Sequence, residues 1–172
     1  MEKIIFNGIQ DLLDYRIERE TKIKDHRKSE AKFCDSLDDD LKEILINLDY
    51  QVISIKREFE LELGRIDYLC KLNNGEYLII EVKAENTKSN KDLVFSFALG
   101  QLLTYRTLFS RQYEISKEKI HLMLLTNEDS AVTLSVINDE SMDIDMLVVL
   151  ESGVKYYGTN RQTKERNQSR AV

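Results

Sequence analysis

The feature that most constrains this chain is a pair of apolar, β-branched runs with a short turn between them, "GRIDYLCKL", "NNG" and "EYLIIEVK". Each run has the length of a single strand, and a turn of this composition joins strands that lie antiparallel. When the turn is centred on Asn74, Asp67 lies opposite Glu81. The same register sets Arg65 opposite Lys83. We therefore expect an antiparallel hairpin in this register.

The second strand of the hairpin ends in two charged residues on one face. Alternation along a strand places Glu81 and Lys83 together, while Ile80 and Val82 point into the opposite layer. Glu81 and the facing Asp67 would have Cβ atoms about 4.5–5.5 Å apart and would repel each other without a proton or a cation. The alternative without function is that Glu81 and Lys83 form a solvated ion pair at a strand end, worth about 0–1 kcal/mol, and that Asp67 is an unrelated surface acid.

A divalent cation is the simplest remedy for that repulsion. Mg²⁺ binds through one or two carboxylates and leaves other positions for water and substrate phosphate, and Mn²⁺ prefers similar oxygen ligands. Asp67 and Glu81 would provide such a half-site. The ammonium group of Lys83 would hold or activate the attacking water and offset charge on a phosphate.

A largely buried helix is expected downstream, from about Leu93 to Arg111, and it carries the motif "GQLLTY". Gln101 and Tyr105 lie four residues apart and therefore on one face of that helix. Buried polar side chains need partners, and bound water or phosphate would provide them. The alternative is that Gln101 reaches solvent and Tyr105 packs in the core. Gly64 is a further residue of interest, because it directly precedes the strand that carries Asp67.

The remaining elements alternate between helical and strand patterns. A charged helix with an apolar stripe is expected over residues 2–28, and a core-facing helix over 36–48 with Ser36 as its N-cap. The run "YQVISIKREFELEL" predicts a strand that precedes the hairpin, and "KIHLMLLT" predicts a central strand reached by a crossover from the buried helix. "DMLVVL" and "VKYY" predict short strands, and "AVTLSVI" is left open between strand and helix.

Composition narrows the class of protein. A chain of 172 residues with 42% hydrophobic content is long enough for one cored domain with an arm or a tail. The sequence has no run of eighteen apolar residues and no secretory signal, so we expect a cytoplasmic protein that does not cross a membrane. Cys34 and Cys70 stand far apart and there are only two histidines, so neither a disulfide framework nor a zinc site is indicated.

The charge of the chain bears on nucleic-acid binding. A net charge of −6 argues against a protein that coats nucleic acid through many phosphate contacts, although local patches remain compatible with binding. The last twelve residues, "RQTKERNQSRAV", hold four basic side chains against one acid and show no apolar periodicity. A solvated, disordered tail is expected there, with phosphate binding as the alternative.

Together these motifs resemble the PD-(D/E)XK nuclease superfamily. Asp67 and the following "EVK" match its acid and acid-x-lysine elements, and "QLLTY" is similar to the QxxxY element of the RecB-like branch. More locally, the hairpin and "GQLLTY" resemble the C-terminal nuclease domain of archaeal and actinobacterial mismatch endonucleases. The resemblance covers residues 50–110. It implies an α/β fold with a restriction-endonuclease-like core, in which helices flank a mixed central sheet.

The resemblance also implies an activity and its residues. It implies metal-dependent hydrolysis of DNA phosphodiester bonds by an endonuclease, with Asp67 and Glu81 as ligands of Mg²⁺ or Mn²⁺. Lys83 would assist the water or the transition state, and Gln101 and Tyr105 would organise the site. The alternatives are a non-catalytic binding subunit or regulatory module of the same fold, and an unrelated interaction protein with an accidental likeness.

The sequence departs from the family pattern in three places. Ile66 stands where the name-giving proline would be. Residues 1–28 show no counterpart of the N-terminal DNA-binding domain of the mismatch endonucleases, so mismatch specificity is not carried over. An N-terminal helix glutamate often joins the site in this superfamily, and Glu30 is the candidate here, with Glu58 and Glu60 as rivals.

The expected organisation has three parts: a helical arm over 1–28, the nuclease-like domain over 29–158 and a basic tail over 159–172. DNA is the expected partner. A homodimer is also expected, because two related sites under two-fold symmetry are the simplest way to cut both strands of a duplex. The stripe of the arm is the expected contact.

Overall fold

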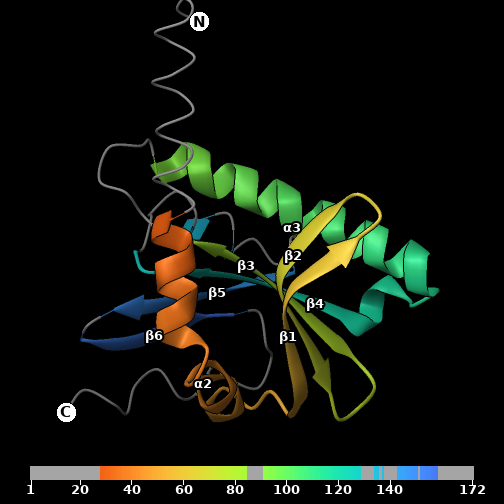
Figure 1. The fold of residues 1–172 in the computed structure, drawn as a ribbon, viewed down its shortest axis with the longest axis horizontal. Coiled ribbons are helices and arrows are strands. Elements are labelled where there is room, and N and C mark those ends of the chain that lie inside the picture. The colour runs from red at the N-terminus through yellow and green to blue at the C-terminus, as the bar shows by residue number, and fades with distance from the viewer. Residues whose placement is uncertain are drawn as a thin grey trace, which may run out of the picture.

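The computed structural model describes residues 28–84, 91–128, 134–135, 137, 143–150 and 152–158. The described strands form one six-stranded sheet in the order β1-β2-β3-β4-β5-β6, and helices cover both faces (Figure 1). Most of the expected arm and the whole tail lie outside these residues. The elements are α2 (Leu41–Asn47), β1 (Val52–Leu61), β2 (Gly64–Leu72), β3 (Tyr77–Lys83), α3 (Lys91–Tyr113), the short 3₁₀ helix η1 (Lys117–Lys119), β4 (Ile120–Thr126), β5 (Ile144–Leu150) and β6 (Gly153–Tyr157).

The sheet is mixed, as the sequence predicted. β1, β2 and β3 are successive antiparallel neighbours, β3, β4 and β5 run parallel, and β6 returns antiparallel to β5. The long helix α3 makes the crossover between the parallel strands β3 and β4. The predicted strands "KIHLMLLT", "DMLVVL" and "VKYY" correspond to β4, β5 and β6. Of the ambiguous run "AVTLSVI", residues 134, 135 and 137 are helical.

One face of the sheet packs against α3. The buried side chains of this helix recur every three or four residues and form a stripe that faces the sheet. The stripe covers apolar residues of β2 to β5, so the helix is fixed along most of its length. The members of this first core cluster include Phe95, Ala98, Leu99, Leu102 and Phe109 from the helix and Ile79, Leu122, Leu124, Ile144 and Met146 from the sheet.

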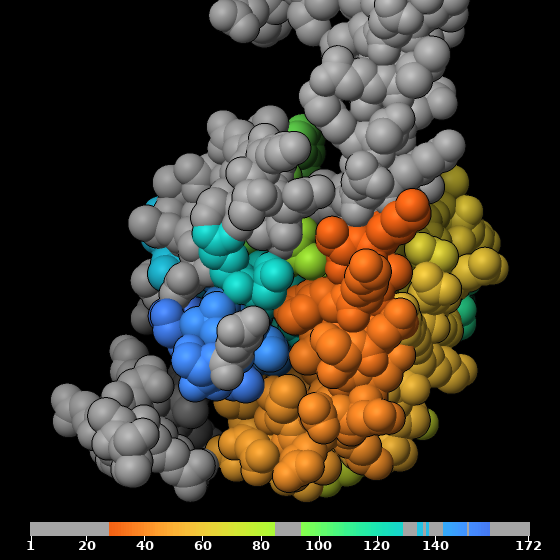
Figure 2. Space-filling view, turned by 60° about the vertical axis from the view of Figure 1, so that its left-hand side comes forward, coloured from red at the N-terminus to blue at the C-terminus, as the bar shows by residue number. Residues whose placement is uncertain are grey.

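The other face is covered by a helical segment over residues 28–37 and by α2 (Figure 2, orange). Here the sequence prediction of one helix over 36–48 is wrong. Ser36 lies inside the first helical segment, where its Oγ donates to the Phe33 carbonyl oxygen at 2.7 Å, and α2 begins after a turn over 38–40. The buried Cys34 and Leu37 extend the apolar stripe upstream, which explains why helix starts earlier than Ser36.

The β1–β2 hairpin changes the face it presents part of the way along. Tyr68 belongs to the second core cluster, whereas Ile66, two residues earlier, belongs to the first. On β1 the break falls at Glu58, whose φ of 53° is unusual for a residue with a side chain. The far end of the hairpin therefore curls over α3 (Figure 1, yellow). Asp67 lies at this turning point.

Among the described residues, no helix has the length and apolarity that crossing a bilayer would require.

Candidate active site

The β2–β3 hairpin has the register that the sequence predicted. Tyr68 pairs with Ile80, and three further pairs follow with the same offset toward the turn. The ladder ends at Tyr68, because β2 leaves β3 there and continues with β1 alone. Neither expected pair beyond it, Asp67 with Glu81 or Arg65 with Lys83, is therefore part of the ladder. The side chain of Asp67 still contacts β3, because its Oδ2 accepts a hydrogen bond of 2.8 Å from the Val82 amide.

The carboxyl end of β3 carries a buried ion pair. Glu81 is only 2% exposed, and its Oε1 accepts a hydrogen bond of 2.6 Å from Lys83 Nζ. The same ammonium group lies 3.5 Å from Oε1 of Glu30, which comes from the helical segment over 28–37. The structure thus brings Glu30, the first of the three candidate glutamates, to Glu81 and Lys83.

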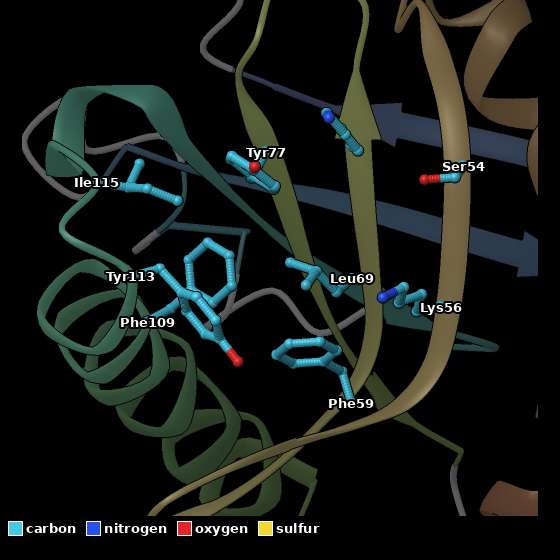
Figure 3. A pocket seen from close by; sticks show the side chains of 9 residues that line it. Ser54, Lys56, Phe59, Leu69, Tyr77, Phe109, Tyr113 and Ile115 are labelled. Atoms are coloured by element: carbon cyan, nitrogen blue, oxygen red, sulfur yellow. The ribbon is translucent and has the colours of Figure 1, made fainter.

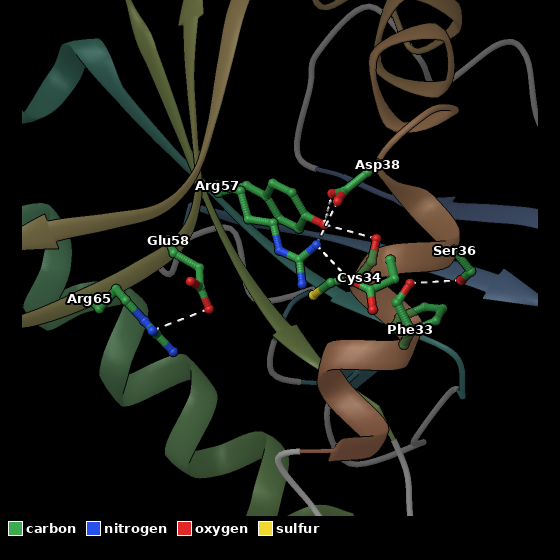
Figure 4. A network of polar contacts seen from close by, with 9 residues as sticks. Phe33, Cys34, Ser36, Asp38, Arg57, Glu58 and Arg65 are labelled. Carbon is green, nitrogen blue, oxygen red and sulfur yellow. Dashed lines mark hydrogen bonds and ion pairs between the residues drawn. The ribbon is translucent and has the colours of Figure 1, made fainter.

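The two rival glutamates lie elsewhere on the hairpin. Glu58 is exposed and pairs with Arg65 at 3.2 Å between Oε1 and Nη1 (Figure 4). Glu60 is exposed and lies opposite Arg65 in the β1–β2 ladder. Neither side chain pairs with Lys83 among the described contacts, although the charge of Glu58 contributes to raising the pKa of Asp67.

A second polar network fixes the segment that supplies Glu30. Arg57 on β1 donates from Nη1 to Asp35 Oδ1 at 2.7 Å and to Asp38 Oδ2 at 2.5 Å (Figure 4). The Tyr68 hydroxyl donates to Asp38 Oδ1 at 2.6 Å. These contacts join the helical segment and the following turn to β1 and β2, so the position of Glu30 is coupled to the strand that carries Asp67.

Burial and mutual charge shift the pKa of each group in the site. Burial raises the pKa of Glu81 to about 7, and the charge of Asp67 acts in the same direction. Burial also raises the pKa of Asp67, against the Val82 amide and Lys83, which lower it. Burial lowers the pKa of Lys83, but the charges of Glu81 and Glu30 raise it by more. Lys83 therefore keeps its proton at neutral pH.

One oxygen of the site lacks a hydrogen-bond partner. Glu81 Oε2 is buried and accepts no hydrogen bond from the described residues. Leaving a buried carboxylate oxygen unsatisfied is costly unless a proton or a cation meets it. Hard divalent cations take such oxygen ligands, so Glu81 and the nearby Asp67 fit a cation of this class. The described residues form no cluster of three or more histidine, cysteine, aspartate or glutamate side chains suited to a metal ion, so the protein would supply only part of a coordination shell.

Helix α3 brings both of its expected residues to the same place. Gln101 Nε2 donates to the Tyr105 hydroxyl at 3.5 Å, and both side chains are half-buried. Burial raises the pKa of Tyr105, the charges of Glu81 and Asp67 raise it further, and the hydrogen bond with Gln101 lowers it.

Gly64 makes the approach of Tyr105 possible. A Cβ atom at this position would lie 2.9 Å from Tyr105 Cε1, and the φ of +106° is one that side-chain-bearing residues rarely adopt. The sequence marked this glycine without giving its reason, which is the close contact between the start of β2 and the ring of Tyr105.

A hollow of about 640 Å³ lies beside Tyr105, between α3 and the β1–β2 turn. The sequence analysis named Gly64, Gln101 and Tyr105 of its lining but missed the exposed apolar residues, because it treated α3 as apolar on most sides and therefore buried. Phe97 is instead 67% exposed, as is Leu63 of the turn at 71%. The signal was present in the spacing, since Phe97, Gln101 and Tyr105 follow one another at intervals of four along one face of the helix.

Comparisons in sequence assign this chain to no family. No family model matches the chain, and no curated protein matches it in sequence. The structure has the α/β architecture that the resemblance in sequence implied, a mixed sheet flanked by helices, with a helical segment, the antiparallel strands β1 to β3, the crossover helix α3 and the parallel strand β4 in chain order.

Three solved structures align with parts of this chain. A repair endonuclease from Pyrococcus abyssi aligns with a TM-score of 0.48 and 17% identity over 69% of this chain and 45% of its own. The structure of an EndoMS–dsDNA complex aligns with a TM-score of 0.41 and 16% identity over 64% and 44%. An XisH family protein from Nostoc punctiforme PCC 73102 aligns with a TM-score of 0.46 and 17% identity over 66% and 92%. The chain thus spans less than half the length of the first two proteins.

Proposed function

We propose that the protein is a metal-dependent nuclease that hydrolyses DNA phosphodiester bonds and cuts within the strand. The observation that carries the proposal is that the buried Glu81 carboxylate, next to Asp67, has one oxygen on Lys83 and the other without a hydrogen-bond partner among the described residues. A purely structural ion pair would not need a second acid beside the first. A site that receives a cation and a phosphate would need both acids and the lysine.

The roles of the side chains follow from their contacts. Asp67 and Glu81 would hold Mg²⁺ or Mn²⁺, with Glu30 as a further acid near the site. A divalent cation, when bound, supplies Lewis-acid chemistry: it makes water more acidic and offsets charge on the phosphate. Lys83 stays protonated, so it acts as a cation and hydrogen-bond donor toward a phosphate oxygen rather than as a base. Glu30 holds the ammonium group from the opposite layer.

The hollow beside Tyr105 would receive the substrate strand. Gln101 and Thr104 offer hydrogen-bonding groups along α3, and Phe97 offers an exposed aromatic ring. Such a mixture suits a DNA strand, whose backbone accepts hydrogen bonds and whose bases stack on rings. DNA is also named with one structural neighbour, the EndoMS–dsDNA complex.

The proposal is tested by cleavage of single-stranded, duplex and branched DNA and of RNA, each with Mg²⁺, Mn²⁺ or EDTA. We expect DNA to be cut within the strand in a metal-dependent reaction. The variant Lys83→Ala should lose this activity. The matched control is Lys42→Ala, which removes an exposed lysine from α2 on the opposite face of the sheet and should cut normally.

A non-catalytic module of the same fold is the second candidate. It is favoured by the lack of a three-acid cluster among the described residues and by the net charge of −6. The two candidates differ in a metal titration: Mg²⁺ or Mn²⁺ should raise the thermal midpoint of the nuclease, and should not do so in Glu81→Ala. The second candidate would be established if the wild-type protein cut none of the substrates and neither cation raised its thermal midpoint.

A further inference from the structure

A second cavity, of about 350 Å³, lies on the α3 face of the sheet beside the last turns of the helix (Figure 3). Its aromatic walls are Phe59, Tyr77, Phe109 and Tyr113, drawn from β1, β3 and the last turns of α3. Lys56 and Lys71 also line it. Its volume lies within the range of pockets that take small ligands, which have apolar walls and few polar groups.

The sheet register explains why two lysines meet at this cavity. Ser54 on β1, Lys71 on β2 and Tyr77 on β3 lie side by side across three strands. Lys56 belongs to the next row along the same face, opposite Leu69. Because α3 ends at Tyr113, it covers these rows only in part: Leu69 is buried in the first core cluster, whereas both lysine side chains are exposed.

The aromatic rings form a connected group that leaves one ring accessible. The centroid of Phe109 lies 4.9 Å from that of Tyr113, 5.2 Å from that of Tyr77 and 6.0 Å from that of Phe59. Phe109 is buried, whereas Tyr113 is 43% exposed at the mouth. Lys56 Nζ lies 5.7 Å from the centroid of the Phe59 ring, so positive charge adjoins the aromatic surface.

This combination selects a planar ligand that carries negative charge. Every nucleobase has a π-face that stacks on aromatic side chains, and a lysine ammonium group binds phosphate as a point charge. No aspartate or glutamate is among the described residues that line the cavity, so nothing there repels a phosphate. An acidic peptide would meet the lysines equally well but would leave the rings without a flat partner.

We propose that this cavity binds an unpaired nucleotide of the DNA strand that the active site cuts. The inference rests on the proposed function for its choice of DNA. Tyr77 and Lys83 are six residues apart on β3, or about 20 Å at ~3.3 Å per residue. At ~3.4 Å per nucleotide along one strand, this span corresponds to about six nucleotides. The preferred substrate is therefore a strand with an unpaired base about six nucleotides from the cut.

The first test places a reporter in the cavity mouth. The chain contains no tryptophan, so Tyr113→Trp would carry the only one. Binding of the oligonucleotide (dT)12 should quench its fluorescence with saturation, because a stacked base contacts the indole. The matched control is Ile46→Trp, at 45% exposure on the opposite face, which should not be quenched. If fluorescence anisotropy detects (dT)12 binding without quenching of Tyr113→Trp, or if (dT)12 does not bind, the proposal is overturned.

The second test measures affinity with labelled (dT)12 in EDTA. Tyr113→Ala should weaken binding roughly 5- to 100-fold, and Tyr113→Phe should retain it, because the contact is to the ring. The double variant Lys56→Gln, Lys71→Gln should reduce the slope of log K against log salt by about 1.4, whereas Lys42→Gln should leave it unchanged. Unchanged affinity and slope in the cavity variants would overturn the proposal.

The two proposals fail in different ways. If Lys83→Ala abolishes cleavage while Tyr113→Ala binds (dT)12 as the wild type does, the nuclease function stands and the cavity proposal falls. If the wild type cuts no substrate but binds (dT)12 through Tyr113, the cavity proposal stands as a nucleotide-binding site and the nuclease function falls.

Discussion

Lys83 is held more tightly than a lysine at a strand end normally is. Its side chain is 13% exposed and contacts two acids from different layers. Lys83→Ala leaves Glu81 and Glu30 without their cation, so we predict a loss of stability of about 1–3 kcal/mol at pH 8 along with the loss of cleavage. Chemical denaturation of Lys83→Ala and of Lys42→Ala measures this effect. Equal stability of the two variants would show that the ion pair contributes only to catalysis.

Glu81 gives the metal-free protein a defined pH dependence. The pKa of this carboxyl is raised by burial from an ordinary value of 4.5 to about 7, so between these values the folded state holds a proton that the unfolded state has released. Stability therefore falls as pH rises from 4.5 to 7, by at most about 3 kcal/mol. In EDTA, we predict that the thermal midpoint of the wild type falls over this range relative to that of Glu81→Gln. Parallel curves for the two proteins would contradict the shifted pKa.

At the scale of elements, the contact between β2 and α3 is the most specific one in the site. Gly64→Ala would place a Cβ atom 2.9 Å from Tyr105 Cε1 at a φ of +106°. We predict a cost of about 1–3 kcal/mol and a strong loss of cleavage, because Tyr105 must move. The matched control is Gly75→Ala, where φ is +82° and no atom lies within 4 Å, so it should lose about 1 kcal/mol and keep its activity. Equal cleavage activity of the two variants would show that the position of Tyr105 does not matter for cleavage.

The sequence predicted those elements whose determinants are local. The "NNG" turn and the alternation around it are local, and the β2–β3 register came out as expected. The face change of the β1–β2 hairpin has no local signal in alternation, because it depends on Glu58 at a φ of 53° and on packing against α3. As a result, Asp67 approaches β3 through the Val82 amide rather than through a continued ladder. The predicted start of a helix at Ser36 was wrong for a similar reason. Serine is a residue type that favours the N-cap, but Ser36 lies within a helical turn.

At the scale of the whole molecule, the site is where all three layers meet. Glu30 comes from the helices on one face, Glu81 and Lys83 from the sheet, and Gln101 and Tyr105 from the helix on the other face. The sequence could nominate these residues by type and spacing, but only the three-layer packing brings Glu30 to Lys83 and Tyr105 to the carboxylates. Which side chains are exposed also depends on how the layers pack. Phe97 is apolar, so its residue type alone did not indicate that it faces outward.

Assembly is the last property to test. Each chain carries one candidate site, so cutting both strands of a duplex is simplest in a homodimer with two-fold symmetry. The proposed contact is the apolar stripe Ile5, Ile9, Leu12 and Leu13, which lies outside the described residues.

For a dimer of 20.2 kDa chains, we predict a mass of about 40 kDa by light scattering at micromolar concentration. Exchange of the wild type with excess Lys83→Ala gives a sharper readout on supercoiled plasmid. Mixed dimers hold one working site and should accumulate nicked circles, whereas wild-type dimers should produce linear DNA. A fully active species of 20.2 kDa, or linear product in proportion to the wild-type fraction without excess nicking, would show that each chain acts alone.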